Sequence, residues 1–110
     1  MKRTGIYFQL KDGAREGYVE AHKNIWPQMR EVLNEAGIQN YSIWNLGQKL
    51  FAYYETEDEE QTQKVLACSE VYGRWRDMME EFVYIEEGTG TKEWPMELVF
   101  YNQGKEREDL

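Results

Sequence analysis

The stretch QNYSIWNLGQKLFAYYE, residues 39–55, decides how the rest of this chain is interpreted. Two strand-like runs that carry several aromatic residues, 39–45 and 49–55, flank the short connection Leu46-Gly47-Gln48. Runs of this kind around a connection that contains Gly predict a β-hairpin. Helical patterns lie on both sides of the stretch, so we expect the hairpin to form the middle of the domain.

The segment before the hairpin predicts one strand and one helical region. Residues 4–10 are rich in β-branched and aromatic residues, which indicates a first strand, and a turn follows at 11–13. From 14 to 36 apolar residues recur every three or four positions, as on one stripe of a helix, and Gly37 follows where helices usually end. Pro27 lies inside this region, and we expect it to bend the helix or split it into two.

The segment after the hairpin predicts a second helical region and a last strand. Asp58 is placed to cap a helix that runs to about Phe82, with a break near Cys68 where Ser69 caps the second part. Residues 86–95 indicate a loop, and 96–101 read as the last strand.

The expected order is therefore β-α-β-β-α-β within one domain over residues 1–103, followed by a charged tail at 104–110 that we expect to fray. This is the ferredoxin-like arrangement of the α+β class: a four-stranded antiparallel sheet with both helices on one face. A large aromatic face would remain on the other side of the sheet. Its candidate residues are Tyr7 or Phe8, Tyr41 or Trp44, and Tyr53 or Tyr54. We expect a sheet-on-sheet homodimer of the α/β barrel type, or a ligand pocket, to cover that face.

The composition excludes several classes of function. With 110 residues there is room for one domain, and 13 basic against 21 acidic residues gives 13 − 21 = −8, which disfavours binding to nucleic acid or an anionic membrane. The longest apolar runs are too short for a membrane helix or a signal peptide, so we expect a cytoplasmic protein. With one Cys and one His we expect neither a disulfide nor a structural metal site, and no cofactor-binding motif is present.

The only histidine, His22, is the candidate for acid–base chemistry. It lies on the apolar stripe, one turn after Tyr18 and one turn before Trp26. A histidine in this setting is either a hydrogen-bonded core residue or a group that lines a pocket. An imidazole exchanges protons near neutral pH because its ordinary pKa is about 6.5.

The aromatic residues, eight Tyr, four Trp and four Phe, are suited to a carbohydrate ligand. Tyr and Trp offer an apolar ring that can stack on a sugar and a polar group that can hydrogen-bond its hydroxyls. The alternative is that most of them fill the core and a dimer interface. The runs of Glu and Asp are interpreted as solvated surface.

Several motifs resemble the L-rhamnose mutarotase family. The segment YVEAHKNIWP, residues 18–27, is similar to its signature Y-x-x-x-H-x-x-I-W-P. The similarity covers about residues 1–101 and continues in four further segments: Asn40-Tyr41-Ser42-Ile43, Leu50-Phe51-Ala52, Arg74-Trp75 ahead of Met78, and Glu97-Leu98-Val99-Phe100-Tyr101.

The resemblance implies an enzyme that interconverts the α and β anomers of L-rhamnose without a metal or an organic cofactor, in a dimer of ferredoxin-like domains. It implies that His22 is the proton donor and that Tyr18 and Tyr41 bind the sugar. The family has a Trp pair in the second helical region that contacts the sugar, and here this pair reads Trp75-Arg76.

Arg76 cannot stack as a Trp does, although its planar guanidinium can bond sugar hydroxyls. Gln28 also stands where the family pattern leads us to expect an acidic residue. These departures leave the proposed acid in place and concern the sugar preference, so a related 6-deoxyhexose remains an alternative substrate. Two other functions are retained: a cofactor-free monooxygenase of the dimeric ferredoxin-like type, and a small-ligand-binding module without catalysis in which His22 is structural.

Overall fold

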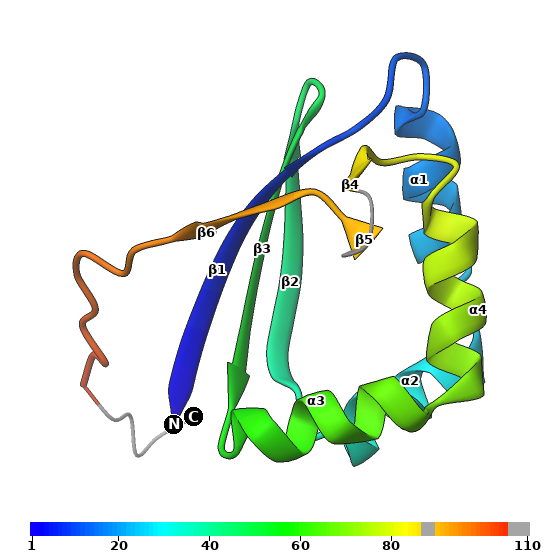
Figure 1. The fold of residues 1–110 in the computed structure, drawn as a ribbon. Coiled ribbons are helices and arrows are strands. Elements are labelled where there is room, and N and C mark those ends of the chain that lie inside the picture. Colours follow the sequence, from blue (N-terminus) through cyan, green and yellow to red (C-terminus); the bar gives the residue numbers. More distant parts are fainter. Residues whose placement is uncertain (87–89, 106–110) are drawn as a thin grey trace.

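The computed structural model describes residues 1–86 and 90–105, and it consists of two layers, a sheet and a set of helices on one of its faces (Figure 1). The four-stranded antiparallel sheet has the order β2-β3-β1-β6. Its strands are β1 (Lys2–Gln9), β2 (Gln39–Leu46), β3 (Lys49–Thr56) and β6 (Glu93–Met96). The hairpin that the sequence predicts is β2-β3, and the ferredoxin-like arrangement is confirmed.

Each of the two expected helical regions consists of two shorter helices. The first region contains α1 (Arg15–Lys23) and α2 (Pro27–Glu35), and the second contains α3 (Glu59–Cys68) and α4 (Glu70–Met79). Within the described ranges, none of these helices is long and apolar enough to cross a bilayer.

The breaks between these helices lie where the sequence places them. Pro27 is the first residue of α2, a position where its missing N–H costs no intrahelical hydrogen bond. The hydroxyl of Ser69 accepts a hydrogen bond from the Tyr72 N–H at 3.1 Å and caps α4. The carboxylate of Asp58 accepts from the Gln61 N–H at 3.1 Å and caps α3 in the same way.

The strand register decides which aromatic residues face the helices. Ile6 on β1 and Ile43 on β2 both pair with Ala52 on β3. Because side chains alternate along a strand, Phe8, Tyr41 and Tyr54 lie on the helix-facing side, whereas Tyr7, Trp44 and Tyr53 lie on the open face.

The prediction for the last strand is wrong in its position. The strand β6 covers Glu93–Met96, most of which was expected to be loop, and residues 97–101 pair with no strand. Pro95 is tolerated in β6 because β6 is an edge strand, so no partner needs the missing N–H. The rest of the expected loop contains a short hairpin of β4 (Ile85–Glu86) and β5 (Gly90–Thr91), and residues 87–89 lie outside the described residues.

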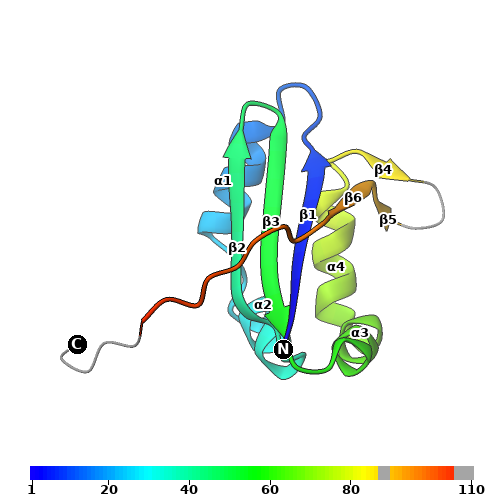
Figure 2. The ribbon, with the colours of Figure 1, turned by 90° about the vertical axis from the view of Figure 1, so that its left-hand side faces the viewer.

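Residues 97–101 form a C-terminal arm that leaves the sheet on the side away from the helices (Figures 1 and 2). Its side chains Val99 and Phe100 are 89% and 81% exposed, and Tyr101 touches the sheet through the Arg3 guanidinium, 3.7 Å from its ring centre. High β-propensity describes residues that suit a half-buried pleated surface, and a single chain gives this segment no such surface. Residues 106–110 of the predicted tail lie outside the described residues.

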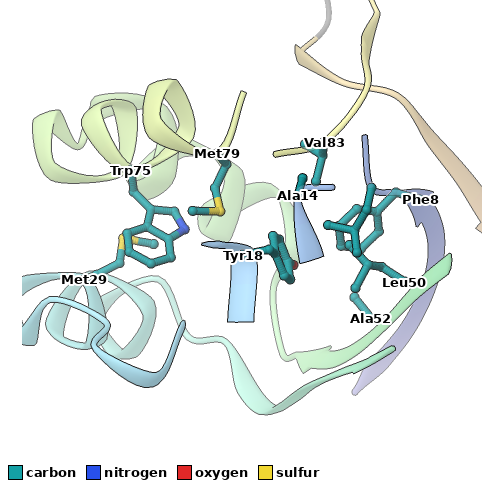
Figure 3. Close-up of a cluster of buried hydrophobic side chains, with 10 residues drawn as sticks. Phe8, Ala14, Tyr18, Met29, Leu50, Ala52, Trp75, Met79 and Val83 are labelled. Carbon is teal, nitrogen blue, oxygen red and sulfur yellow. The ribbon is translucent and has the colours of Figure 1, made fainter. Parts of the chain in front are cut away.

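The core lies between the sheet and the helices. Phe8, Leu50 and Ala52 approach it from the sheet, and Trp75 lies beside Met29 and Met79 on the helical side (Figure 3). Tyr18 is located between these two groups. The candidate site residues Tyr18 and Trp75 are therefore also members of the core, with only 5% and 6% of their surfaces exposed.

Candidate active site

A cavity of about 840 Å³ lies between the helix-facing side of the sheet and the helices. The structure brings all five sequence-predicted site residues to its wall. They are Tyr18 and His22 from α1, Tyr41 from β2, and Trp75 and Arg76 from α4. Elements far apart in the sequence thus meet around one space.

One nitrogen of His22 is committed to the backbone and the other is available. Nδ1 lies 2.9 Å from the carbonyl oxygen of Tyr18. A carbonyl oxygen only accepts hydrogen bonds, so Nδ1 carries the hydrogen and donates it. In the neutral imidazole Nε2 is then the basic nitrogen, and no described residue hydrogen-bonds it. The last turn of α1 thereby holds His22 in the tautomer whose basic nitrogen is free for a ligand.

The surroundings of His22 favour its neutral form. Its ring is 4.2 Å from the ring of Tyr18 and 5.3 Å from that of Trp75, centre to centre. Partial burial between these rings lowers the pKa of His22 below its ordinary 6.5, and the hydrogen bond to the Tyr18 carbonyl opposes this shift only in part. At neutral pH the group is therefore ready to accept a proton.

Two tyrosine hydroxyls of the wall keep their protons near neutral pH. Burial raises the pKa of Tyr18 and of Tyr41 well above the ordinary phenol value. Tyr41 nevertheless has 45% of its surface exposed. The exposure of Tyr41 and its raised pKa are compatible because Tyr41 lines a cavity. Water reaches part of its surface there, although protein surrounds the side chain. Both hydroxyls can donate and accept hydrogen bonds to a sugar.

Trp75 supports the site as well as lining it. Its ring meets that of Trp26 edge-on at 5.2 Å and that of His22 edge-on at 5.3 Å. Such edge-to-face contacts fix the positions of rings that pack in a core. The same indole therefore holds the imidazole in place and presents an apolar surface to the cavity.

Sequence reasoning did not assign several further polar residues of the wall to the site, among them Tyr54, Tyr72, Thr91 and Glu93. The sequence could have indicated Tyr72, since it lies one helical turn before Arg76 on α4. Thr91 and Glu93 carried no usable signal, because their segment was expected to be a loop. Burial raises the pKa of Glu93, and the charge of Arg76 opposes that shift. Among the described residues, no group of three or more His, Cys, Asp or Glu could hold a metal ion.

Comparison of the sequence with known proteins shows the family to which the chain belongs. A family model described as L-rhamnose mutarotase matches residues 3–102. The chain belongs to the L-rhamnose mutarotase family. Among curated members, the L-rhamnose mutarotase of Bacteroides thetaiotaomicron is 31% identical over 92% of this chain and 98% of that protein.

Solved structures agree with the fold. The crystal structure of the L-rhamnose mutarotase of Formosa agariphila superposes with a TM-score of 0.80 at 26% identity, over 94% of this chain and all of that one. A putative antibiotic biosynthesis monooxygenase from Nitrosomonas europaea superposes with a TM-score of 0.61 at 16% identity, over 91% of this chain and all of that chain. The second similarity concerns the fold alone and gives no support to monooxygenase chemistry in this family member.

Proposed function

We propose that this protein interconverts the α and β anomers of L-rhamnose, or of a closely related 6-deoxyhexose, with His22 as the acid–base group. One observation carries the proposal: in a member of the mutarotase family, an imidazole with an available Nε2 lines a cavity together with tyrosine hydroxyls. A core histidine would have both nitrogens satisfied by the protein.

The chemistry follows from the hemiacetal. Neutral His22 takes the proton of the anomeric hydroxyl at Nε2, the C1–O1 bond becomes a carbonyl, and the C1–O5 bond breaks. A cavity hydroxyl or a water molecule supplies the proton that the ring oxygen O5 requires. Rotation about C1–C2 presents the other face of the aldehyde, O5 attacks it and loses its proton again, and the His22 imidazolium returns its proton to O1.

The resemblance implies that His22 is the proton donor. The neutral form that its lowered pKa favours makes the imidazole the proton acceptor in ring opening instead, and the donor in closure. A positioned acid–base group of this kind typically accelerates such steps by about 10²–10⁴-fold.

The other predicted residues would bind the sugar. The hydroxyls of Tyr18 and Tyr41 stay protonated at neutral pH and so can donate to sugar oxygens. The indole of Trp75 offers an apolar surface for the C–H groups of the pyranose. Arg76 supplies donors for sugar hydroxyls but no acceptor.

We further propose that the enzyme is a homodimer and acts in the cytoplasm. The open sheet face carries ring contacts from Tyr7 to Phe51 at 5.4 Å and to Trp94 at 5.2 Å, beside the exposed Trp44. A second copy would cover this aromatic row and the C-terminal arm. The single cysteine, Cys68, is a free thiol, which fits a reducing compartment.

Saturation transfer in NMR tests the reaction. At equilibrium each anomer of L-rhamnose has its own anomeric proton signal, and irradiating one should reduce the other when a trace of protein is present, with both populations unchanged. The variant His22→Gln, which keeps the size and polarity of the side chain but cannot cycle a proton, should not do so. If the wild-type protein exchanges the signals no faster than buffer does, the proposal is wrong.

A further inference from the structure

A side pocket of about 260 Å³ adjoins the main cavity and has a more polar lining. Six residues line both spaces: Gln63, Leu66, Tyr72, Arg76, Thr91 and Glu93. Among these six, only Leu66 has an aliphatic side chain, whereas the main cavity is walled largely by the aromatic and aliphatic side chains of the core. The molecule thus offers a polar recess beside a mostly apolar one.

Two opposite charges face this pocket from different elements. Arg76 extends from α4, and Glu93 is the first residue of β6, where it pairs with Phe8 across the sheet. The two groups form no ion pair within 4.0 Å, although the charge of Arg76 opposes the rise that burial causes in the pKa of Glu93. A gap between a guanidinium and a carboxyl group in a pocket leaves both with unused hydrogen-bonding capacity.

The backbone at Gly90 is adapted to the position of Arg76. A Cβ atom at residue 90 would overlap the Arg76 guanidinium, and Gly90 has a φ of +93°, which side-chain-bearing residues rarely adopt. The guanidinium carbon of Arg76 also lies 5.8 Å from the ring centre of Tyr72. The guanidinium therefore lies close to Tyr72 on its own helix and to the β5 backbone.

The chemistry of the pair identifies its ligand class. A guanidinium only donates hydrogen bonds, and an ionised carboxylate only accepts them, whereas a hydroxyl does both. A sugar hydroxyl can thus accept from Arg76 and donate to Glu93 at once. A methyl group in the same place offers neither group a hydrogen bond, so the pair gives a 6-deoxy sugar no added affinity. An anionic group would be repelled by Glu93.

Among the substituents of a hexopyranose, the hydroxyl on C6 is the one that stands off the ring on a rotatable bond. Because the two spaces share six lining residues, such a hydroxyl can enter the side pocket while the ring remains in the main cavity. We propose that Arg76 and Glu93 form a hydroxyl-binding subsite that extends the substrate range from 6-deoxyhexoses to hexoses with a hydroxyl on C6. This inference rests on the proposed function for the position of the sugar ring.

The matched probes are L-rhamnose and L-mannose, which differ only in carrying a hydrogen or a hydroxyl on C6. Calorimetry gives the dissociation constant of each sugar for the wild-type protein and for the variants Arg76→Leu and Glu93→Gln. We expect both variants to weaken L-mannose binding about tenfold relative to L-rhamnose. The variants Arg74→Leu and Asp77→Asn, which remove charges from exposed positions of α4 outside the cavity, should leave the ratio unchanged.

The outcomes separate this inference from the proposed reaction. If Arg76→Leu and Glu93→Gln leave the ratio of the two dissociation constants unchanged, the subsite does not exist, whatever the enzyme catalyses. If Glu93→Gln instead lowers kcat equally for both sugars without changing the ratio, Glu93 serves the reaction and the inference fails. If the ratio changes as expected but neither sugar shows saturation transfer, the subsite stands and the mutarotase proposal fails.

Discussion

The imidazole of His22 and the phenols around it have different expected roles, and isosteric substitutions distinguish them. Tyr18→Phe and Tyr41→Phe remove one hydroxyl each and leave the ring packing intact. We expect each to slow anomer exchange less than His22→Gln does, because a binding hydroxyl is lost but the acid–base group remains. Saturation-transfer rates for the three variants give the order directly. If Tyr18→Phe slowed anomer exchange more than His22→Gln does, the phenol of Tyr18 and not the imidazole would be the proton carrier.

The lowered pKa of His22 predicts a pH dependence with a definite sign. The pKa is below 6.5 in the folded protein, so the neutral imidazole that starts the reaction is present at pH 7 and disappears as the pH falls through that lower value. Exchange should therefore be flat near neutrality and decline in mild acid. The titration of the His22 ring protons by NMR should have the same midpoint, and an activity loss with a midpoint above 6.5 would contradict the assignment.

The same shift affects stability. An unfolded chain has a histidine pKa of about 6.5, so between that value and the lower folded pKa the unfolded state binds more protons. The free energy of unfolding should therefore decrease as the pH falls below about 6.5. His22→Gln should lack this component in denaturant titrations at successive pH values.

Trp75 illustrates how one side chain combines packing with binding. It is 6% exposed and contacts the rings of His22 and Trp26. We expect Trp75→Ala to cost about 3–5 kcal/mol of stability because it leaves a hole in the core. Below its unfolding transition the variant should also show a raised KM for the sugar. Urea unfolding measures the first effect, and a stability unchanged within 1 kcal/mol would place the indole outside the core.

At the scale of elements, the start of α4 matters most, because this helix carries both Trp75 and Arg76 to the cavity. Ser69 caps it through its hydroxyl. Ser69→Ala should destabilise the protein by about 1 kcal/mol, and Ser69→Asp, which retains an acceptor at the cap, should not. Thermal unfolding of the three proteins is the measurement. If both variants lost the same stability, the contribution of Ser69 would not come from capping α4.

For the molecule as a whole, we expect two copies to associate through the open sheet face. Trp44 is 68% exposed there, and the arm adds Val99 and Phe100. Light scattering at micromolar concentration should give twice the mass of one chain for the wild-type protein. Trp44→Glu should give the mass of one chain, while Gln28→Glu, which adds the same charge on an exposed position of α2, should remain dimeric. A wild-type mass near 13.2 kDa would refute the dimer.

Local features of this protein are readable from its sequence. Pro27 and Ser69 divide the two helical regions because a missing N–H and a capping hydroxyl act within one turn of the chain. Gly47 allows the tight turn of the β2–β3 hairpin through its φ of +60°, which is also a local effect. The helix period places His22 and Tyr18 on one face of a helix, and the resemblance to the mutarotase family identified them as candidate site residues without coordinates.

The sequence by itself thus determined the order of elements, the helix breaks and the pairing of His22 with Tyr18. Only the tertiary structure decided that Tyr41 faces the cavity while Trp44 faces outward, since a shift of one residue in the β2–β3 register would exchange them. It also decided that β6 begins at Glu93, which brings a carboxyl group to the cavity beside Arg76. The physical reason is that register and edge-strand position depend on contacts between segments that lie far apart in the chain, and no local pattern records those contacts.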